Sequence, residues 1–176
     1  MAVLISFSAF AAAADQSDSR LADLFARLME TQDLGEAFRV ESEIWTVWLE
    51  HDDEAVRLLL DKGIAAMNRG DHRGALEDFD QIVAIAPDFA EGWNKRATVH
   101  YLLGNYKESL DDIAETLALE PRHFGALSGR GLVYGELEEL ELALESFEAA
   151  LEVHPNMVGP RRNAEALRRH LQDQEI

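Results

Sequence analysis

The side chains with the most potential for chemistry in this chain are its histidines: His51, His72, His100, His123, His154 and His170. A zinc site would need ligand spacings such as H-E-x-x-H, and no such spacing occurs here. His100 is better explained as a histidine packed between two helices than as a catalytic group. The chain has no cysteine, which excludes disulfides, thiolate metal ligands and a catalytic thiol. We therefore expect no metal, no cofactor and no catalytic centre.

Two other patterns could suggest chemistry, and helices explain both. Residues 129–135 are rich in glycine, as phosphate-binding loops are, but they follow no predicted strand and lie inside a helical pattern. In the acidic stretch 136–148, carboxylates alternate with Leu137, Leu140, Leu144 and Phe147, which is typical of an amphipathic helix with a charged outer face. The sequence therefore does not predict an enzyme.

The charge balance narrows the choice of partners. Thirty-four acidic residues against sixteen basic ones give a net charge of −18. Such a charge repels nucleic-acid phosphates and anionic lipid head groups, so neither is expected to bind. The charge is explained by a well-solvated surface, and a site for basic partners is the alternative.

The first fourteen residues carry no charge, and Ala12, Ala13 and Ala14 stand directly before Asp15. They are too few to span a bilayer, but they have the length of a signal-peptide core and satisfy the A-x-A cleavage rule. No Lys or Arg precedes Arg20, which departs from the usual signal pattern. We expect residues 1–14 to be a signal peptide or its remnant, and the protein to be periplasmic or secreted without stable membrane insertion. A cytoplasmic protein with an apolar tail or first helix is the alternative.

Internal repetition is the strongest signal in the sequence. Pro87, Pro121 and Pro155 are 34 residues apart and close the similar phrases IVAIAP, TLALEP and ALEVHP. This period divides the chain into repeats at 56–89, 90–123 and 124–157. Within each repeat, small residues recur at positions 8 and 20 and a large apolar one at position 24: Gly63, Ala97 and Gly131; Ala75, Ser109 and Ala143; Phe79, Ile113 and Phe147. Small residues allow two helices to approach closely, and the large residue fills the space between them.

These residues resemble the tetratricopeptide repeat, a 34-residue unit with the pattern W-x2-L-G-x2-Y, A-x3-F and P. Trp93 and Tyr134 match its aromatic positions, and the resemblance covers about 100 residues. It implies an all-α, right-handed solenoid of helical hairpins that binds proteins. The turn glycine of the first two repeats is replaced by Glu138 in the third, so the third turn is less well predicted.

Basic residues occupy position 7 of every repeat: Lys62, Arg96 and Arg130. The facing helix carries Asp78 and Asp112 in the first two repeats, so we expect ion pairs within those hairpins. The third repeat has Ser146 there, which leaves Arg130 as the cation most available to a ligand.

The segments on either side of the repeats are helical but do not match them. Residues 15–53 contain two apolar stripes and are predicted to form a degenerate hairpin that caps the stack. Residues 158–176 are predicted to form a capping helix, with Ala164, Leu167 and Leu171 facing inward and its arginines in water. Together with 1–14 and the repeats at 54–157, these segments make up the predicted organisation.

The resemblance also implies a binding surface, because the first helices of such repeats line a concave face and touch ligands at positions 2, 5, 9, 12 and 13. The predicted groove residues are Leu60, Ile64, Met67, Asn94, Thr98, Tyr101, Ser128 and Leu132. This mostly apolar lining suits a peptide segment better than a nucleotide or a sugar. Of the Lys and Asn clamp that some family members use for a C-terminal carboxylate, only Asn94 has a counterpart, so that specificity is not expected.

Two functions remain open at this point. The first is an adaptor, scaffold or chaperone-like module that binds a protein or peptide segment in the groove. The second is a structural subunit whose concave surface is permanently buried by another copy or a complex partner.

Overall fold

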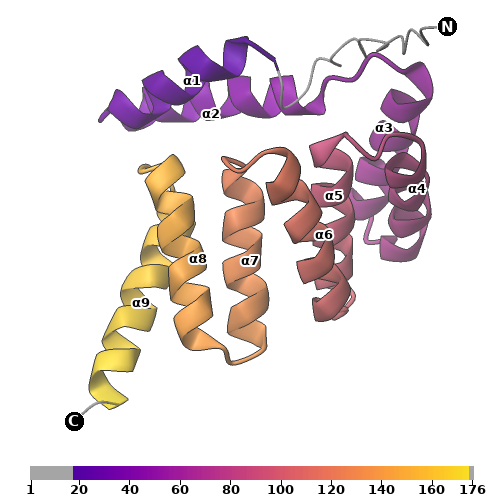
Figure 1. The fold of residues 1–176 in the computed structure, drawn as a ribbon. Coiled ribbons are helices and arrows are strands. Elements are labelled where there is room, and N and C mark those ends of the chain that lie inside the picture. Colours follow the sequence, from indigo (N-terminus) through magenta and orange to yellow (C-terminus); the bar gives the residue numbers. More distant parts are fainter. Residues whose placement is uncertain (1–17, 175–176) are drawn as a thin grey trace, which may run out of the picture.

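The computed structural model describes residues 18–174, and this part of the chain is helical throughout (Figure 1). The helices are α1 (Arg20–Glu30), α2 (Leu34–Leu49), α3 (Glu54–Asn68), α4 (His72–Ile85), α5 (Ala90–Leu102), α6 (Tyr106–Leu119), α7 (Phe124–Glu136), α8 (Leu140–Val153) and α9 (Val158–Gln174). The predicted all-α solenoid is confirmed. Residues 1–14, and with them the predicted signal peptide, lie outside the described residues. None of the described helices combines the length and apolar composition needed to cross a bilayer.

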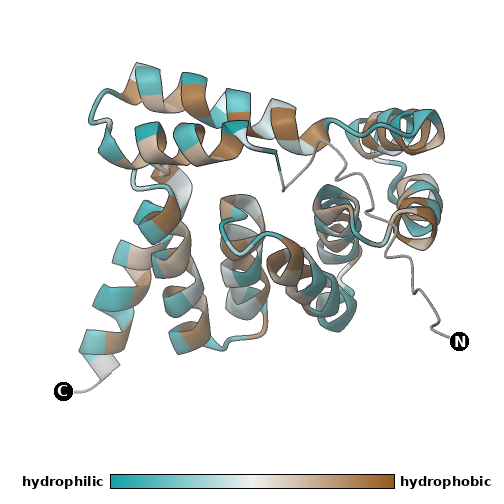
Figure 2. Ribbon diagram, turned by 45° about the horizontal axis from the view of Figure 1, so that its top comes forward, coloured by the Kyte–Doolittle hydropathy of each residue, from teal (hydrophilic) through white to brown (hydrophobic). Residues whose placement is uncertain are grey.

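Helices α3 to α8 form three successive hairpins, each made of a helix pair within one 34-residue repeat (Figure 1). The small residues at position 8 are explained by the packing of each pair. A Cβ atom on Gly63 would lie 2.6 Å from the ring of Phe79, and one on Gly131 would lie 2.7 Å from the ring of Phe147. Both distances are below a normal carbon contact, so only glycine allows the helices to come this close. Hydrophobic and hydrophilic residues alternate along the helices (Figure 2).

All three hairpin turns close in the same way. Gly70 and Gly104 have φ of 77°, and Glu138 has φ of 60°, so each turn contains one residue in the left-handed region. Glycine adopts this conformation without steric cost, whereas glutamate does not. The third turn therefore keeps the repeat geometry in spite of its sequence and carries a local strain that the other two lack.

The hairpin of α1 and α2 is not stacked on the outer side of α3 and α4, as an end cap would be, and this part of the prediction is wrong. It lies across the ends of the later helices (Figure 1). Its own core includes Leu28, Ile44 and Trp48, and this core continues into Phe124, the first residue of α7. The position follows from the aromatic side chains: Phe25 and Trp48 meet the ring of Phe124 at centroid distances of 6.5 and 5.0 Å.

Helix α9 packs on α8, and its role as a capping helix stays a prediction. Ala164 is fully buried and Leu167 is half-buried against the core of α8, while Arg161, Arg162, Arg168 and Arg169 are exposed. Arg168 reaches Glu148 of α8 at 2.8 Å. The nine helices within residues 18–174 fall inside the predicted segments 15–53, 54–157 and 158–176, although the division into domains remains a prediction.

Candidate functional site

The candidate site is a groove along α5, α7 and α9, the helices that follow one another on one side of the solenoid. A cavity of about 210 Å³, here called the α5–α7 cavity, lies between the first two. A second cavity of about 280 Å³, the α7–α9 cavity, lies between the last two. Leu132 lines both, so the two cavities are neighbours along α7. Such a lining, apolar with a few polar groups, is typical of a site for an organic ligand or a peptide.

The structure brings five of the eight predicted groove residues together in the α5–α7 cavity: Asn94, Thr98, Tyr101, Ser128 and Leu132. The other three come from α3 and do not line it. Leu60 is only 3% exposed and packs in the core around Phe79, so it cannot line an open groove and its prediction is corrected. Ile64 and Met67 are half-buried against the same core.

The polar groups of the cavity are held in place by short-range hydrogen bonds. Asn94 is 7% exposed, and its Nδ2 donates to Glu91 Oε2 at 2.8 Å. The hydroxyl of Thr98 donates to the carbonyl of Asn94 at 2.9 Å. Tyr101 packs beside Tyr106, whose hydroxyl donates to Glu136 Oε2 at 3.3 Å. Burial first, and then the charge of Glu136 and a hydrogen bond to it, raise the pKa of Tyr101, so its hydroxyl stays protonated.

The repeating cations at position 7 are engaged within their hairpins. Lys62 Nζ lies 2.5 Å from Asp78, and Arg96 makes two bonds of 2.8 and 2.7 Å to Asp112. The predicted pairs are therefore present. Arg130 faces Ser146 in place of an aspartate, and its Nε donates to Ser146 Oγ at 3.0 Å. Its availability to a ligand stays a prediction.

Next to the groove lies a buried charged cluster that the sequence analysis did not predict. The carboxylate of Glu91 on α5 is 1% exposed. Lys95 Nζ approaches it at 2.6 Å and His123 Nε2 at 2.9 Å. Burial acts to raise the pKa of Glu91, but the charge of Lys95 and the hydrogen bond from His123 outweigh it and lower the pKa to about 2. Glu91 is therefore ionised.

His123 joins three helices at this cluster. Its Nδ1 accepts from the backbone N–H of Ala126 at 3.0 Å and so caps the start of α7. A nitrogen that accepts carries no proton, so the proton of the neutral ring lies on Nε2, which donates to Glu91 of α5. The ring also stacks on Trp48 of α2 with a centroid distance of 4.1 Å and an interplanar angle of 9°.

Helix α2 consequently closes one end of the groove. Glu91 and Gly125 are the position 2 residues of their repeats, and α2 covers both: Lys95, paired with Glu91, lies 5.2 Å from the ring centroid of Trp45, and a Cβ on Gly125 would lie 2.7 Å from that ring. Positions 5, 9 and 12 remain in the open cavity. Two tryptophans three residues apart, outside the repeats, were the available signal for this contact.

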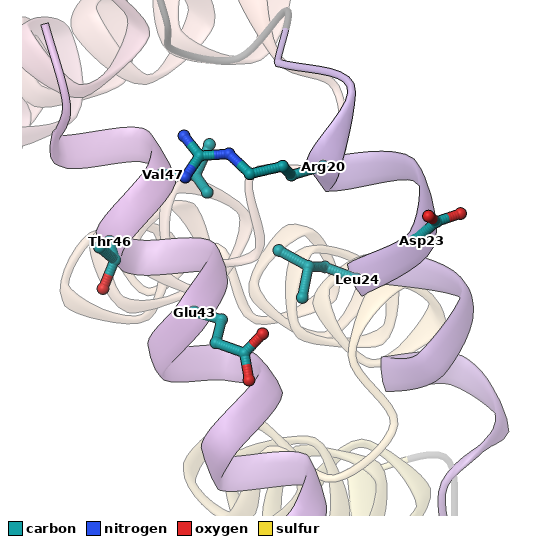
Figure 3. Close-up of a pocket in the computed structure, with 6 residues that line it drawn as sticks. All are labelled: Arg20, Asp23, Leu24, Glu43, Thr46 and Val47. Atoms are coloured by element: carbon teal, nitrogen blue, oxygen red, sulfur yellow. The ribbon is translucent and has the colours of Figure 1, made fainter.

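The remaining cavities offer less. The space between α1 and α2, about 350 Å³, is lined by Leu24 and Val47 together with charged side chains that are largely engaged, since Arg20 binds Asp18 and Glu50. In Figure 3, Leu24 points toward α2 and the carboxylate of Asp23 points away from it.

Within residues 18–174, no group of three acidic, histidine or cysteine residues could hold a metal ion. His100 is half-buried and lies 3.3 Å from the amide of Asn105.

Comparison with known proteins agrees with this geometry. The sequence pattern of the tetratricopeptide repeat matches residues 60–122 and 103–158. A TPR repeat-containing protein of Rhizobium etli is 34% identical over 143 residues, which cover 81% of this chain and 70% of that protein. The chain belongs to the tetratricopeptide repeat family. It matches smaller shares of other family members: the bovine Protein SGT1 homolog is 33% identical over 82 residues, which are 47% of this chain and 24% of the relative.

Solved tetratricopeptide repeat structures share the fold at lower identity. The first TPR domain of RPAP3, bound to an HSP90 peptide, superposes with a TM-score of 0.66 at 22% identity and covers 69% of this chain and 96% of that one. The protein MamA superposes with a TM-score of 0.63 at 20% identity and covers 89% and 84%. These likenesses establish the solenoid fold.

Proposed function

We propose that this protein binds a peptide segment of another protein in the groove along α5, α7 and α9, as an adaptor, scaffold or chaperone-like module and not as an enzyme. The observation that carries the proposal is the α5–α7 cavity, which gathers Asn94, Thr98, Tyr101, Ser128 and Leu132 in one open, mostly apolar lining. RPAP3 holds its HSP90 peptide on the same fold. Long side chains of a peptide fit cavities of this kind, and main-chain groups of the peptide can bond to the amide and hydroxyl groups between them.

Tyr101 is the expected anchor of the bound segment. It combines a large apolar ring with a hydroxyl. Truncating an aromatic residue near the centre of an interface commonly weakens the binding free energy by about 2 kcal/mol. Tyr101 also packs against the core shared by α5, α6 and α7, so its truncation has a cost in stability as well. The experiment must therefore measure both the binding affinity and the melting temperature of each variant.

The test begins with a photoreactive amino acid at Thr98 in the groove and, as a control, at Leu142 on the outer helix α8. Crosslinking in the native host should capture a partner only from Thr98. Tyr101→Ala should then weaken that partner's binding by about tenfold or more, while Tyr101→Phe, which keeps the ring, retains most of it. If the loss of affinity only follows the fall in melting temperature, Tyr101 does not contact the partner. If a partner is captured from Leu142 alone, the groove is not the binding site.

We also propose that the protein is exported to the periplasm or secreted. The uncharged first fourteen residues and the alanines at their end support this. The intact mass of the protein from its native host should correspond to a chain that begins at Asp15. A stable chain that begins at Met1 or Ala2 in a cytosolic fraction would contradict export.

A further inference from the structure

Helix α7 contains more glycine than its packing requires. Four of its thirteen residues are glycine, which stabilises a helix interior less than alanine does. Two are explained within the chain, because a Cβ would lie 2.7 Å from Trp45 at Gly125 and 2.7 Å from Phe147 at Gly131. The other two are not: at Gly129 the nearest atom would be 3.9 Å away, and at Gly135 nothing lies within 4 Å.

The two unexplained glycines both face the groove. Gly129 lines the α5–α7 cavity and Gly135 lines the α7–α9 cavity, on either side of Leu132. With no side chain at these positions, the backbone of α7 is bare at two places along the floor. A ligand can approach it more closely there than at any residue with a Cβ.

The electrostatic character of the groove limits what can bind. The residues that line the α5–α7 cavity are all uncharged, and Glu136 is the one charged residue in the lining of the α7–α9 cavity. Lys95 and Arg96, the nearby cations of α5, are held by Glu91 and Asp112. The arginines of α9 lie outside the lining of both cavities. A carboxylate entering this groove would therefore lose water without gaining a partner, while a cation would meet Glu136.

An amide oxygen in the lining of the α5–α7 cavity is also available to a ligand. Asn94 is 7% exposed, and its Nδ2 is bonded to Glu91, which fixes Oδ1 as the free end of the amide. Among the described residues, no hydrogen bond to this Oδ1 is formed. A backbone N–H of a bound segment is the donor that would satisfy it.

We propose, on the basis of the peptide-binding function above, that the groove selects an apolar segment that carries a Lys or Arg and no carboxylate. The segment packs its backbone against Gly129 and Gly135, donates to Asn94, and places its cation beside Glu136. Acidic C-terminal peptides are rejected by the same groove, because no cation in its lining receives them.

The test is selection of random peptides displayed on phage against the full chain, followed by fluorescence anisotropy of the enriched peptides. We expect apolar sequences with Lys or Arg. Gly129→Leu, which fills the α5–α7 cavity, should weaken their binding by about tenfold or more. Gly159→Leu is the matched control, since Gly159 is also a helical glycine with nothing within 4 Å and lies outside the groove. Glu136→Lys should weaken binding by about threefold to fivefold, and Glu145→Lys, the same charge change on the outer helix α8, should not.

The outcomes separate the two proposals. If the enriched peptides are acidic, or if Glu136→Lys strengthens binding, the proposed peptide chemistry is wrong although the groove still binds peptides. If no peptide is enriched, or if the enriched peptides bind Gly129→Leu as well as the unchanged chain, the proposed binding of peptides in this groove is wrong. Circular dichroism of each variant is the control that it is folded.

Discussion

The pair of Arg96 and Asp112 links the two helices of the central hairpin. Asp112 is buried, and the guanidinium makes two bonds to its carboxylate. We expect the double mutant of Arg96→Ala and Asp112→Ala to be less damaging than the sum of the single mutants, with a coupling of at least about 0.5 kcal/mol in the free energy of unfolding. Urea unfolding of the unchanged chain, the two single mutants and the double mutant measures this coupling.

The exposed pair of Lys107 and Asp111 provides the control cycle, because both side chains are largely in water and lie one turn apart on α6. Its coupling should be smaller than that of the buried pair. Equal couplings would mean that burial does not strengthen the contact between Arg96 and Asp112.

Glu91 should make the stability of the protein depend on pH in the acid range. Its ordinary pKa of 4.5 applies in the unfolded chain, whereas Lys95 and His123 hold it at about 2 in the folded one. The ionised carboxylate thus stabilises the fold above about pH 4.5, and this contribution is lost as the pH falls toward 2. At pH 7, Glu91→Gln should lower the free energy of unfolding by about 3 kcal/mol, because it leaves Lys95 partly buried without its charge partner.

The measurement compares melting temperatures of the unchanged chain and Glu91→Gln from pH 7 down to pH 3. The difference between the two should narrow below pH 4.5, since only the unchanged chain loses the ionised Glu91. Glu115→Gln, at an exposed position on α6, is the control and should show a small difference at every pH. A difference that stays constant for Glu91→Gln would show that this carboxyl is not held ionised by its neighbours.

At the scale of single elements, the glycines of α7 have opposite roles that simple substitutions can separate. Gly129→Ala gains helix propensity and clashes with no neighbour, so it should raise the free energy of unfolding by up to about 1 kcal/mol. Gly125→Ala pushes a methyl group into the ring of Trp45 and should lower it by about 1 to 3 kcal/mol. Thermal unfolding of both variants tests this. If Gly125→Ala stabilised the chain as much as Gly129→Ala, α2 would not be docked on the start of α7.

The elements that the sequence predicts well are those whose packing repeats. The helices from α3 to α8 are predicted from positions 8, 20 and 24 of the repeat. Each hairpin uses similar residue types there to bring its two helices close together, as at Gly63 and Gly131. The place of α1 and α2 could not be predicted in this way. It depends on contacts between Trp48 and residues at the start of α7, such as its N-cap His123, which lie far away in the sequence and belong to no repeating register.

The same distinction applies to the site. Asn94, Thr98 and Tyr101 were predicted because the repeat fixes which face of α5 is turned to the groove, and the structure places them there. Leu60 occupies the same repeat position as Asn94, but on α3 an apolar side chain at that position joins the core around Phe79. The ion pair of Glu91 and Lys95 could be read as a surface pair from its spacing alone. Its burial arises only when α2 covers it.

At the scale of the whole molecule, the groove and the net charge together predict a monomer. The α5–α7 and α7–α9 cavities are open, and α2 closes only one end of the groove. A net charge of −18 repels a second copy at low salt. The competing possibility is a structural subunit whose groove is permanently covered, and exposed apolar side chains such as Phe38 and Val158, 69% and 73% exposed, offer a different place for self-association.

Size-exclusion chromatography with light scattering should therefore give a mass at or below 19.7 kDa, the mass of one full chain, in a buffer of about 0.15 M salt. If copies associate through Phe38 and Val158, a dimer should form in about 1 M salt, where charge repulsion is screened, and Phe38→Lys should abolish it. Association of this kind leaves the groove open, and the peptide-binding function stands. A stable dimer in dilute salt that Gly129→Leu converts to monomer would instead place a second copy in the groove, and the protein would then be a structural subunit.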